Sequence, residues 1–379
     1  MVIILAGAIG RFPVGGQAWC EMQYLLGLRD LQHEVYFLED CGEESSVYNW
    51  ESEQVTNDLD YPTSYVRHCL DPIGLGDRWI YRVGQHSVGM PQDEFLDVCA
   101  RADLFIIRGA IIPQWRSEYD LPRRRIFIDC DPAFVQMGVA NGNRELAATI
   151  EQCDRLFTIG QNIGSPRCPI PTLGKEWLKT VLPVALDYWP AAENGAGLPF
   201  TSVLQWRSYG DVIHEGINYG NKDREFPKFM SLPGVSNQPF RIALTGALPE
   251  MFTEHGWEVV PGWAASQTPV LYQKFIQDSR AEFSVAKQGY VATRSGWFSD
   301  RSACYLASGR PVLIQDTGIS DWLPTGEGVV TFRDLPEALR GIEIINADYE
   351  HHRHLAKSLV EEYFASHRVL PLLLAEAMA

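Results

Sequence analysis

Two acids stand two residues apart after a short apolar run at 125–128. On an extended segment such side chains point to one side, so the carboxylates of Asp129 and Asp131 would lie close together, and their repulsion would raise the pKa of one of them. A carboxylate of that kind can accept a proton from a hydroxyl group. We therefore select Asp131 as the candidate catalytic base. An ordinary Asp-Pro turn is the alternative interpretation, and His86 is a second candidate.

The segment from Lys287 to Arg301 combines glycine, hydroxyl and basic residues just before an expected helix at 303–307. A pyrophosphate needs several hydrogen-bond donors at once, and the free N–H groups and positive dipole of a helix start supply them. The candidate donors and neutralising cations are Ser295, Gly296, Ser299, Lys287 and Arg301. Alternatively, Ser299 or Asp300 simply caps the helix, and the two interpretations are compatible.

Short apolar runs alternate with helical patterns along most of the chain, which is typical of parallel sheets covered by helices. The first forty residues predict a strand at 2–5, a loop at 6–16, a helix at 17–31 and a strand at 34–38, a unit of the doubly wound type. Later strands are expected at 104–107, 125–128, 155–159, 202–206, 240–244, 258–260, 281–285, 311–314 and 328–332. Helices are expected at 93–101, 224–231, 270–278, 303–307 and 335–345. Residues 41–92 show little periodicity, and we expect insertion loops there.

The length of 379 residues favours two domains, because a single hydrophobic core stops growing at about 250–300 residues. Residues 187–190, followed by 191–197, have the composition of a linker. We therefore predict an α/β fold with a Rossmann-like domain at 1–188 and a second at 189–365. Ligands of open parallel sheets bind outside the carboxyl ends of the strands, so the site is expected in the cleft between the domains.

The loop after the first expected strand does not carry a dinucleotide-binding fingerprint. Gly7 and Gly10 stand three residues apart, and Gly15 and Gly16 follow later, so G-x-G-x-x-G is absent. The acidic Glu39 at the end of the second strand cannot restore the pattern alone. This disfavours a dehydrogenase.

Composition limits the partners and the compartment. The net charge of −16 and the pI near 5.0 argue against general binding of nucleic acid or anionic membranes. The eight cysteines are dispersed, with neither C-x-x-C nor metal-ligand spacing, so we expect reduced thiols in a cytoplasmic protein, without disulfide or structural zinc. The apolar run at 2–5 is far too short for a membrane span, and we expect none elsewhere.

The segment at 287–314 contains Ser295-Gly296-Trp297-Phe298-Ser299 and, later, Gly309-Arg310-Pro311-Val312-Leu313. It resembles the donor-binding region of GT-B-fold glycosyltransferases, in which a Gly-rich turn and a helix start precede small-Gly-x-Pro-Val-Leu and a strand. In that family an acid before this element commonly binds the ribose or the sugar, and the nearest acid here is Asp300. The resemblance implies two Rossmann-like domains facing across a cleft, with the donor held by the second. It also implies a terminal helix, here 366–379, that crosses back to the first domain.

Further positions join the candidate site through this resemblance. The Gly15-Gly16 loop is similar to one by which many GT-B proteins approach the diphosphate. Arg207 and Lys222 follow the first strand of the second domain, where several GT-B families place basic residues against the diphosphate. Asp316 and Thr317 follow the strand at 311–314, where side chains reach sugar hydroxyls; a plain turn is the alternative, chiefly for Thr317.

The resemblance implies an enzyme that transfers a sugar from a nucleoside diphosphate sugar to an unidentified acceptor. Relatives usually neutralise the leaving diphosphate with helix dipoles and basic residues, so we expect no metal and no cofactor besides this co-substrate. A sugar-nucleotide epimerase or hydrolase on the same fold, and a non-catalytic nucleotide-sugar-binding module, stay open as alternatives.

Overall fold

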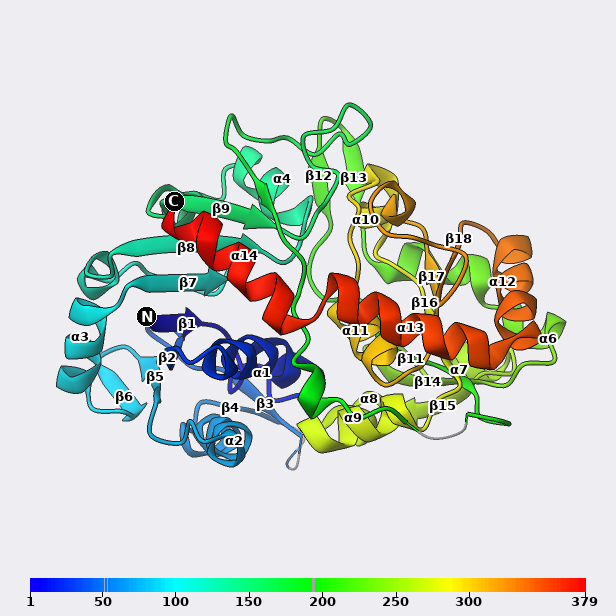
Figure 1. Cartoon of the computed structure of the whole chain (residues 1–379), viewed down its shortest axis with the longest axis horizontal. Helices are drawn as coiled ribbons and strands as arrows, with labels where there is room; N and C mark the ends of the chain where they lie inside the picture. Colours follow the sequence, from blue (N-terminus) through cyan, green and yellow to red (C-terminus); the bar gives the residue numbers. More distant parts are fainter. Residues whose placement is uncertain (51, 53, 193–194) are drawn as a thin grey trace.

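Two parallel sheets lie side by side in the computed structural model, which describes residues 1–50, 52, 54–192 and 195–379 (Figure 1). The larger sheet contains Val2–Ala6 (β1), Glu34–Asp40 (β2), Trp79–Val83 (β5), His86–Gly89 (β6), Leu104–Arg108 (β7), Arg124–Asp129 (β8), Arg155–Thr158 (β9) and Leu178–Lys179 (β10). Its order is β10-β9-β8-β7-β1-β2-β5-β6, and every pair is parallel except β5 with β6.

The smaller sheet is parallel throughout, in the order β15-β14-β11-β16-β17-β18. Its strands are Phe200–Gln205 (β11), Phe240–Thr245 (β14), Glu258–Pro261 (β15), Ala281–Ser284 (β16), Val312–Gln315 (β17) and Val329–Phe332 (β18). Strand order reverses between β1 and β7 in one sheet and between β11 and β16 in the other, and such switch points open a crevice for ligands. The predicted class, two doubly wound α/β halves, is confirmed.

Two short hairpins stand apart from the main sheets: Val47–Asn49 (β3) with Gln54–Thr56 (β4), and Val212–His214 (β12) with Ile217–Tyr219 (β13). The helices are Gly15–Asp30 (α1), Asp60–Leu70 (α2), Gln92–Arg101 (α3), Phe134–Ala140 (α4), Arg144–Glu151 (α5), Leu232–Val235 (α6), Glu250–Thr253 (α7), Gly262–Ser266 (α8), Pro269–Gln277 (α9), Gln288–Thr293 (α10), Asp300–Ala307 (α11), Leu335–Ala347 (α12), Tyr349–Tyr363 (α13) and Ser366–Met378 (α14). Six 3-10 turns complete the elements: Asp71–Ile73 (η1), Ser117–Asp120 (η2), Leu186–Tyr188 (η3), Lys222–Arg224 (η4), Phe226–Phe229 (η5) and Ile319–Asp321 (η6).

The expectation of loops throughout 41–92 is wrong, because this stretch contributes α2 and two strands of the larger sheet. The strand β5 was not predicted because Arg82 places a charged residue in an otherwise apolar run. In the fold Arg82 is buried and pairs with Glu118 at 2.5 Å, so the strand can enter the sheet. The expected helix at 224–231 is instead divided between two 3-10 turns, and Pro227 contributes to this because it has no N–H to donate to a carbonyl of the preceding turn.

Alternate residues of β1 serve the two faces of the larger sheet. Ile3 and Leu5 pack into the core that also holds residues of α1 and α14, whereas Ile4 and Ala6 pack into a second core with α3. Figure 1 shows α14 beside α1 on the first of these faces.

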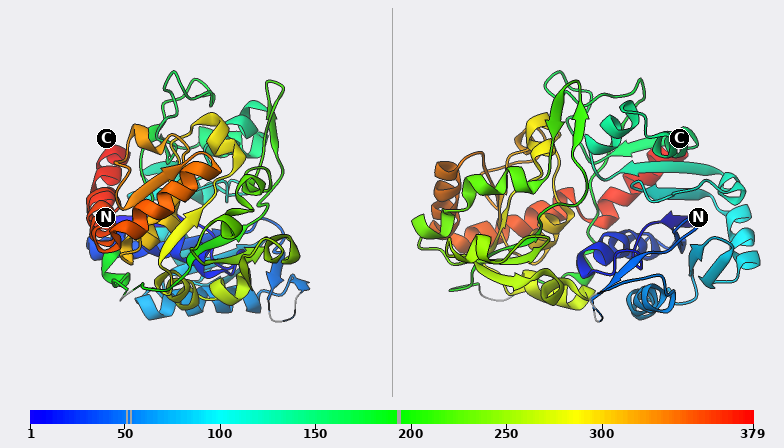
Figure 2. Two further views of the ribbon diagram at one scale, coloured as in Figure 1. Left: turned by 90° about the vertical axis from the view of Figure 1, so that its right-hand side faces the viewer. Right: turned by 180° about the vertical axis from the view of Figure 1, so that it is seen from behind.

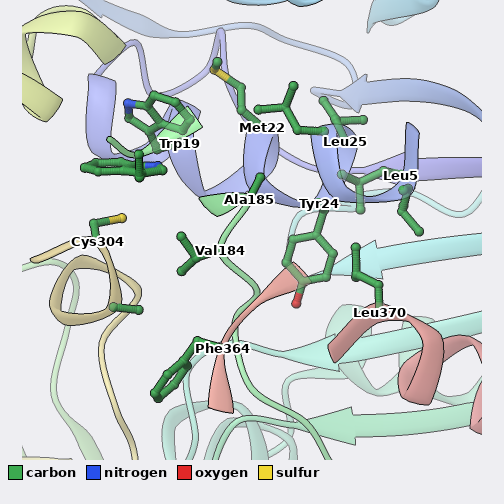
Figure 3. Close-up of a cluster of buried hydrophobic side chains, with 14 of the residues drawn as sticks. Leu5, Trp19, Met22, Tyr24, Leu25, Val184, Ala185, Cys304, Phe364 and Leu370 are labelled. Atoms are coloured by element: carbon green, nitrogen blue, oxygen red, sulfur yellow. The ribbon is translucent and has the colours of Figure 1, made fainter. Parts of the chain in front are cut away.

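The first of these cores continues across both halves of the molecule. Figure 3 shows Trp19 of α1, Cys304 of α11 and Phe364 at the end of α13 within one buried cluster. The two segments that connect the halves also pair with each other: the Val184 N–H donates to the Phe364 carbonyl at 2.7 Å, and the Ser366 N–H donates to the Val184 carbonyl at 2.8 Å. Figure 2 shows the β12–β13 hairpin of the second half standing against α4 of the first.

The domain boundaries at 188/189 and 365/366 stay predictions. Of the expected linker at 191–197, residues 193 and 194 lie outside the described residues.

Candidate functional site

The carboxyl ends of both sheets open into a cleft of about 1120 Å³. Loops after β1, β7 and β8 form the wall on the first half, and segments after β11 and β16 form the wall on the second half. Seven of the sequence-predicted site residues line it: Gly16, Asp131, Lys222, Lys287, Ser299, Asp300 and Arg301.

Lys222 is a buried cation in the wall of the second half. It begins η4, and the residue is only 9% exposed. Its Nζ forms no hydrogen bond or ion pair with any residue that the structure describes. Burial lowers the pKa of Lys222 well below its usual value, and the nearby charges of Arg301 and Lys287 lower it further. A buried charge without a partner is costly, so this position favours an anionic ligand.

Arg301, by contrast, is already neutralised. Its Nε lies 2.6 Å from Oε1 of the fully buried Glu282, and its Nη2 donates to Ser284 Oγ at 2.7 Å. Arg301 therefore contributes a fixed, internally paired charge to the wall.

The start of α11 reaches the cleft and is capped by Ser299, whose Oγ accepts the Arg301 N–H at 3.2 Å. The capping interpretation of Ser299 is thus correct, and the hydroxyl still lies in the cleft wall. Asp300 accepts a hydrogen bond from the thiol of Cys20, across the cleft, at 2.6 Å.

Asp129 and Asp131 do not point to one side as expected, because β8 ends at Asp129 and the chain then turns. Asp129 is fully buried and accepts hydrogen bonds from Gln136 and Thr158, both at 2.7 Å. Its burial, more than the neighbouring Asp131, raises the pKa of Asp129 to about 6. Asp131 alone faces the cleft. The second candidate, His86, is exposed on the edge strand β6 and is not among the residues that line the cleft.

The Asp131 carboxylate is held by three groups of the second half. Lys287 Nζ lies 3.2 Å from Oδ1, and the hydroxyls of Tyr290 and Tyr209 donate to Oδ1 and Oδ2. The two tyrosines were missed. Tyr290 follows Lys287 by three residues at a helix start, a spacing that could have indicated it, whereas Tyr209 meets Asp131 only through the packing of the halves.

Two expected phosphate donors are occupied within the protein. The Ser295 N–H donates to the Tyr290 carbonyl at 3.2 Å, and the Gly296 N–H donates to the Thr317 carbonyl at 2.8 Å. Gly296 has φ +74°, and a Cβ there would stand 3.0 Å from Asn162. These N–H groups are not free for a ligand, which corrects the expectation from sequence.

Three other predicted residues also lie away from the cleft lining. Arg207 pairs with Asp211 at 3.1 Å and with Asp223. Thr317 is fully buried, and its hydroxyl donates to the Trp297 carbonyl at 2.6 Å. Asp316 lines a separate surface pocket of about 340 Å³, together with Arg333 and Arg340. Contacts of these residues with a donor stay predictions.

The two glycines of the first half allow its loop to touch the second half. A Cβ at Gly15 would stand 2.2 Å from the Thr268 carbonyl oxygen, and the Gly16 N–H donates to Ser266 Oγ at 3.2 Å. This close approach fixes one end of the cleft.

The loop after β1 encloses a carboxylate of the protein itself. Buried Glu39 accepts the N–H groups of Ile9, Gly10 and Arg11 at 3.0, 2.8 and 2.7 Å. Such a row of N–H groups is where a nucleotide-binding loop would hold a phosphate. The position is taken, which agrees with the missing dinucleotide fingerprint.

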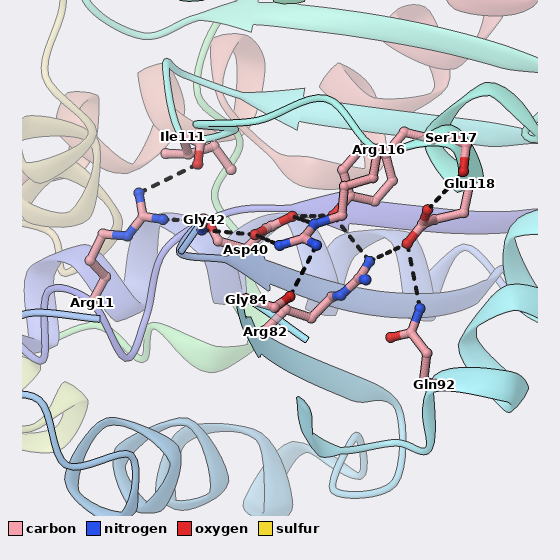
Figure 4. A network of polar contacts seen from close by, with 11 residues as sticks. Arg11, Asp40, Gly42, Arg82, Gly84, Gln92, Ile111, Arg116, Ser117 and Glu118 are labelled. Atoms are coloured by element: carbon pink, nitrogen blue, oxygen red, sulfur yellow. Dashed lines mark hydrogen bonds and ion pairs between the residues drawn. The ribbon is translucent and has the colours of Figure 1, made fainter. Parts of the chain in front are cut away.

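The cleft wall of the first half is aromatic, and both of its arginines are held by other groups of the protein. Phe12 and Tyr48 are exposed, and Tyr48 packs edge to face on Trp50 with ring centroids 4.6 Å apart. Arg108 pairs with buried Glu21 at 2.7 Å. Figure 4 shows Arg11 directed into the polar network around Asp40, where it donates to main-chain carbonyls.

No group of three or more His, Cys, Asp or Glu side chains suited to a metal occurs within the described residues. In the same part of the chain, every helix is too short or too polar to cross a membrane. All eight cysteines are unpaired.

Neither a family model nor a curated protein matches this chain. Solved structures do. An alpha-glucosyltransferase in complex with UDP superposes with a TM-score of 0.60 at 10% identity, covering 100% of this chain and 99% of that chain; it has also been solved with UDP and a 13-mer DNA. Sucrose-phosphate synthase from Thermosynechococcus elongatus gives 0.54 at 13% identity, covering 99% and 98%. A glycosyltransferase from Rickettsia africae gives 0.53 at 9% identity, covering 99% and 97%. The chain therefore has the GT-B fold that its sequence resembled.

Proposed function

We propose that this chain is a glycosyltransferase that moves a sugar from a nucleoside diphosphate sugar to an acceptor hydroxyl. The observation that carries the proposal is Lys222, a buried amine without a partner among the described residues, in a cleft that also receives Arg301 and Lys287. A diphosphate would supply the missing negative charge. The GT-B fold and the UDP bound to a structural neighbour support this choice of anion.

In this proposal the second half binds the donor. Lys222 and Lys287 contact the diphosphate, and the start of α11, with Ser299, supplies further donors to its oxygens. These charges stabilise the leaving group as the bond between the sugar and the diphosphate breaks. We also propose that they do so without a metal, so that a chelator leaves the rate unchanged.

The first half presents the acceptor and the base. As the acceptor oxygen bonds to the sugar carbon, its proton passes to the Asp131 carboxylate, which faces the cleft. The volume of about 1120 Å³ exceeds the range of about 300–1,000 Å³ that is usual for a single small ligand, so donor and acceptor can be present together.

The acceptor is proposed to be uncharged. The aromatic wall and the paired state of Arg108 offer stacking rather than free positive charge, and the net charge of −16 disfavours a polyanion. We therefore do not propose DNA as an acceptor, although a structural neighbour was solved with DNA.

We also propose a cytoplasmic location, which the eight unpaired thiols support.

Melting curves with UDP, dTDP, GDP and ADP test donor binding. One of the four should raise the melting temperature of the wild type by several degrees, and the Lys222→Met variant should lose that shift. Mass analysis of products made from the corresponding sugar nucleotide, with a panel of neutral acceptors, then separates transfer from epimerisation, hydrolysis or binding alone. If none of the four nucleotides raised the melting temperature of the wild type, the proposal would be overturned.

A further inference from the structure

The clasp formed by Asp131, Lys287, Tyr209 and Tyr290 joins the two halves across the cleft. Asp131 comes from the turn after β8, whereas its three partners belong to segments that follow β11 and β16. The Lys287 amine also donates to the Tyr209 hydroxyl. The carboxylate that would accept the proton is therefore occupied by groups of the protein itself.

Lys287 depends on this carboxylate. Its amine lies 4.1 Å from the Tyr209 ring centroid and 5.3 Å from those of Phe134 and Tyr290, and its side chain is 13% exposed. Burial lowers the pKa of Lys287, and Asp131 partly offsets that change. A cation in such a place takes whichever anion is closest and most highly charged.

Lys287 also belongs to the donor wall. It lines the same cleft as Lys222, near enough for its charge to lower the pKa of Lys222. An anion that binds between these two amines would compete with Asp131 for Lys287.

We propose that Lys287 is shared between Asp131 and the donor diphosphate, so that donor binding draws Lys287 away and frees Asp131 for the acceptor proton. This inference rests on the proposed function. Lys287 is then a positioning residue for the base as well as a phosphate ligand. The donor has to bind before the acceptor can react, because Asp131 otherwise stays paired with Lys287.

A double-mutant cycle on nucleotide affinity tests this coupling without any transfer assay. The probe is whichever of UDP, dTDP, GDP and ADP the wild type binds most tightly, measured by titration calorimetry. Asp131→Asn removes the competing charge and keeps the shape, so the diphosphate should bind about three- to tenfold more tightly, as expected for a partly exposed ion pair. In the Lys287→Met background the same change should have no effect.

Two controls keep the test decisive. The nucleoside that matches the probe carries no phosphate, so its affinity should not respond to Asp131→Asn. Asp131→Ser carries the same expectation as Asp131→Asn and replaces it if that variant does not fold.

The outcomes separate the two proposals. If the wild type binds a nucleoside diphosphate but Asp131→Asn leaves its affinity unchanged, weakens it, or tightens it equally without Lys287, the shared lysine is refuted while donor binding stands. If the wild type binds none of the four nucleotides, the proposed function fails and this inference falls with it.

Discussion

The two halves of this protein treat a similar position in opposite ways. In the first half, the loop after β1 is filled by the carboxylate of Glu39, which accepts three main-chain N–H groups. In the second half, the segment after β11 places Lys222 in the cleft wall, where its amine has no hydrogen-bond or ion-pair partner among the described residues. In the first half, the side chain of Glu39 already occupies the anion site. In the second half, the amine of Lys222 is available to pair with an anionic ligand.

This difference indicates which half binds the donor more clearly than the fold does. Both sheets have a switch point, and the doubly wound pattern alone would permit a nucleotide at either. A buried amine without a contacting anion distinguishes the second half from the first. The comparison therefore predicts that removing a satisfied charge harms stability, whereas removing the unsatisfied one harms binding.

The largest effect is expected from Arg301→Met. Arg301 pairs with Glu282, which is fully buried, and its loss leaves that carboxylate without its counter-charge. The free energy of unfolding should fall by about 3–5 kcal/mol, measured by urea denaturation. If the free energy of unfolding fell by less than about 1 kcal/mol, the ion pair between Arg301 and Glu282 would not be the stabilising contact that we infer.

Lys222→Met should have the opposite effect on stability. Affinity for the nucleoside diphosphate should drop about 100-fold, while the free energy of unfolding rises because a buried, unpaired charge disappears. The pKa of Lys222 is lowered in the folded state, so the lysine binds its proton more weakly there than in the unfolded chain, and this difference costs stability at neutral pH. The stability gain should therefore shrink as the pH approaches 10.5, the usual value for an unfolded lysine.

Lys274→Met is the matched control for that prediction. Lys274 is exposed on α9, where it pairs with Asp278 at 2.7 Å. Neither nucleotide affinity nor stability should change appreciably. If the Lys222 and Lys274 variants had the same nucleotide affinity and stability, the claim that Lys222 binds the diphosphate would be contradicted.

Glu39→Gln tests the completed site of the first half. An amide has one acceptor oxygen, so at least one of the three N–H groups around Glu39 loses its partner, and the free energy of unfolding should fall by about 2 kcal/mol. Calorimetry should show unchanged nucleotide affinity. A clear loss of affinity would place the donor in the first half.

The smallest effect is expected at the aromatic wall. Tyr48→Ala removes one stacking surface and should raise the KM for an acceptor found in the transfer screen about five- to tenfold, leaving nucleotide affinity unchanged. A change confined to nucleotide affinity would assign this wall to the donor.

The sequence predicted what depends on local pattern. Most strands of both halves, several helices and the cap at Ser299 could be inferred, because apolar periodicity and capping residues act over a few neighbours. The GT-B fold was implied by the resemblance of the segment at 287–314. The strand β5 was missed because the partner that neutralises Arg82 lies in a distant segment.

The site was harder to infer, since it depends on which polar groups the fold has already satisfied. Ser295 and Gly296 have the right residue types, but their N–H groups bond within the protein. Lys222 and Arg301 look alike in the sequence, and only the contact with Glu282 separates a paired cation from an unpaired one. The role of Tyr209 depends on contact between the halves.

A crystal structure of the protein with its preferred nucleoside diphosphate tests the central claim most directly. We expect the diphosphate in the cleft, with an oxygen at hydrogen-bond distance, about 3 Å, from Lys222 Nζ. A diphosphate bound elsewhere, for example between Arg333 and Arg340 in the separate surface pocket, would contradict it.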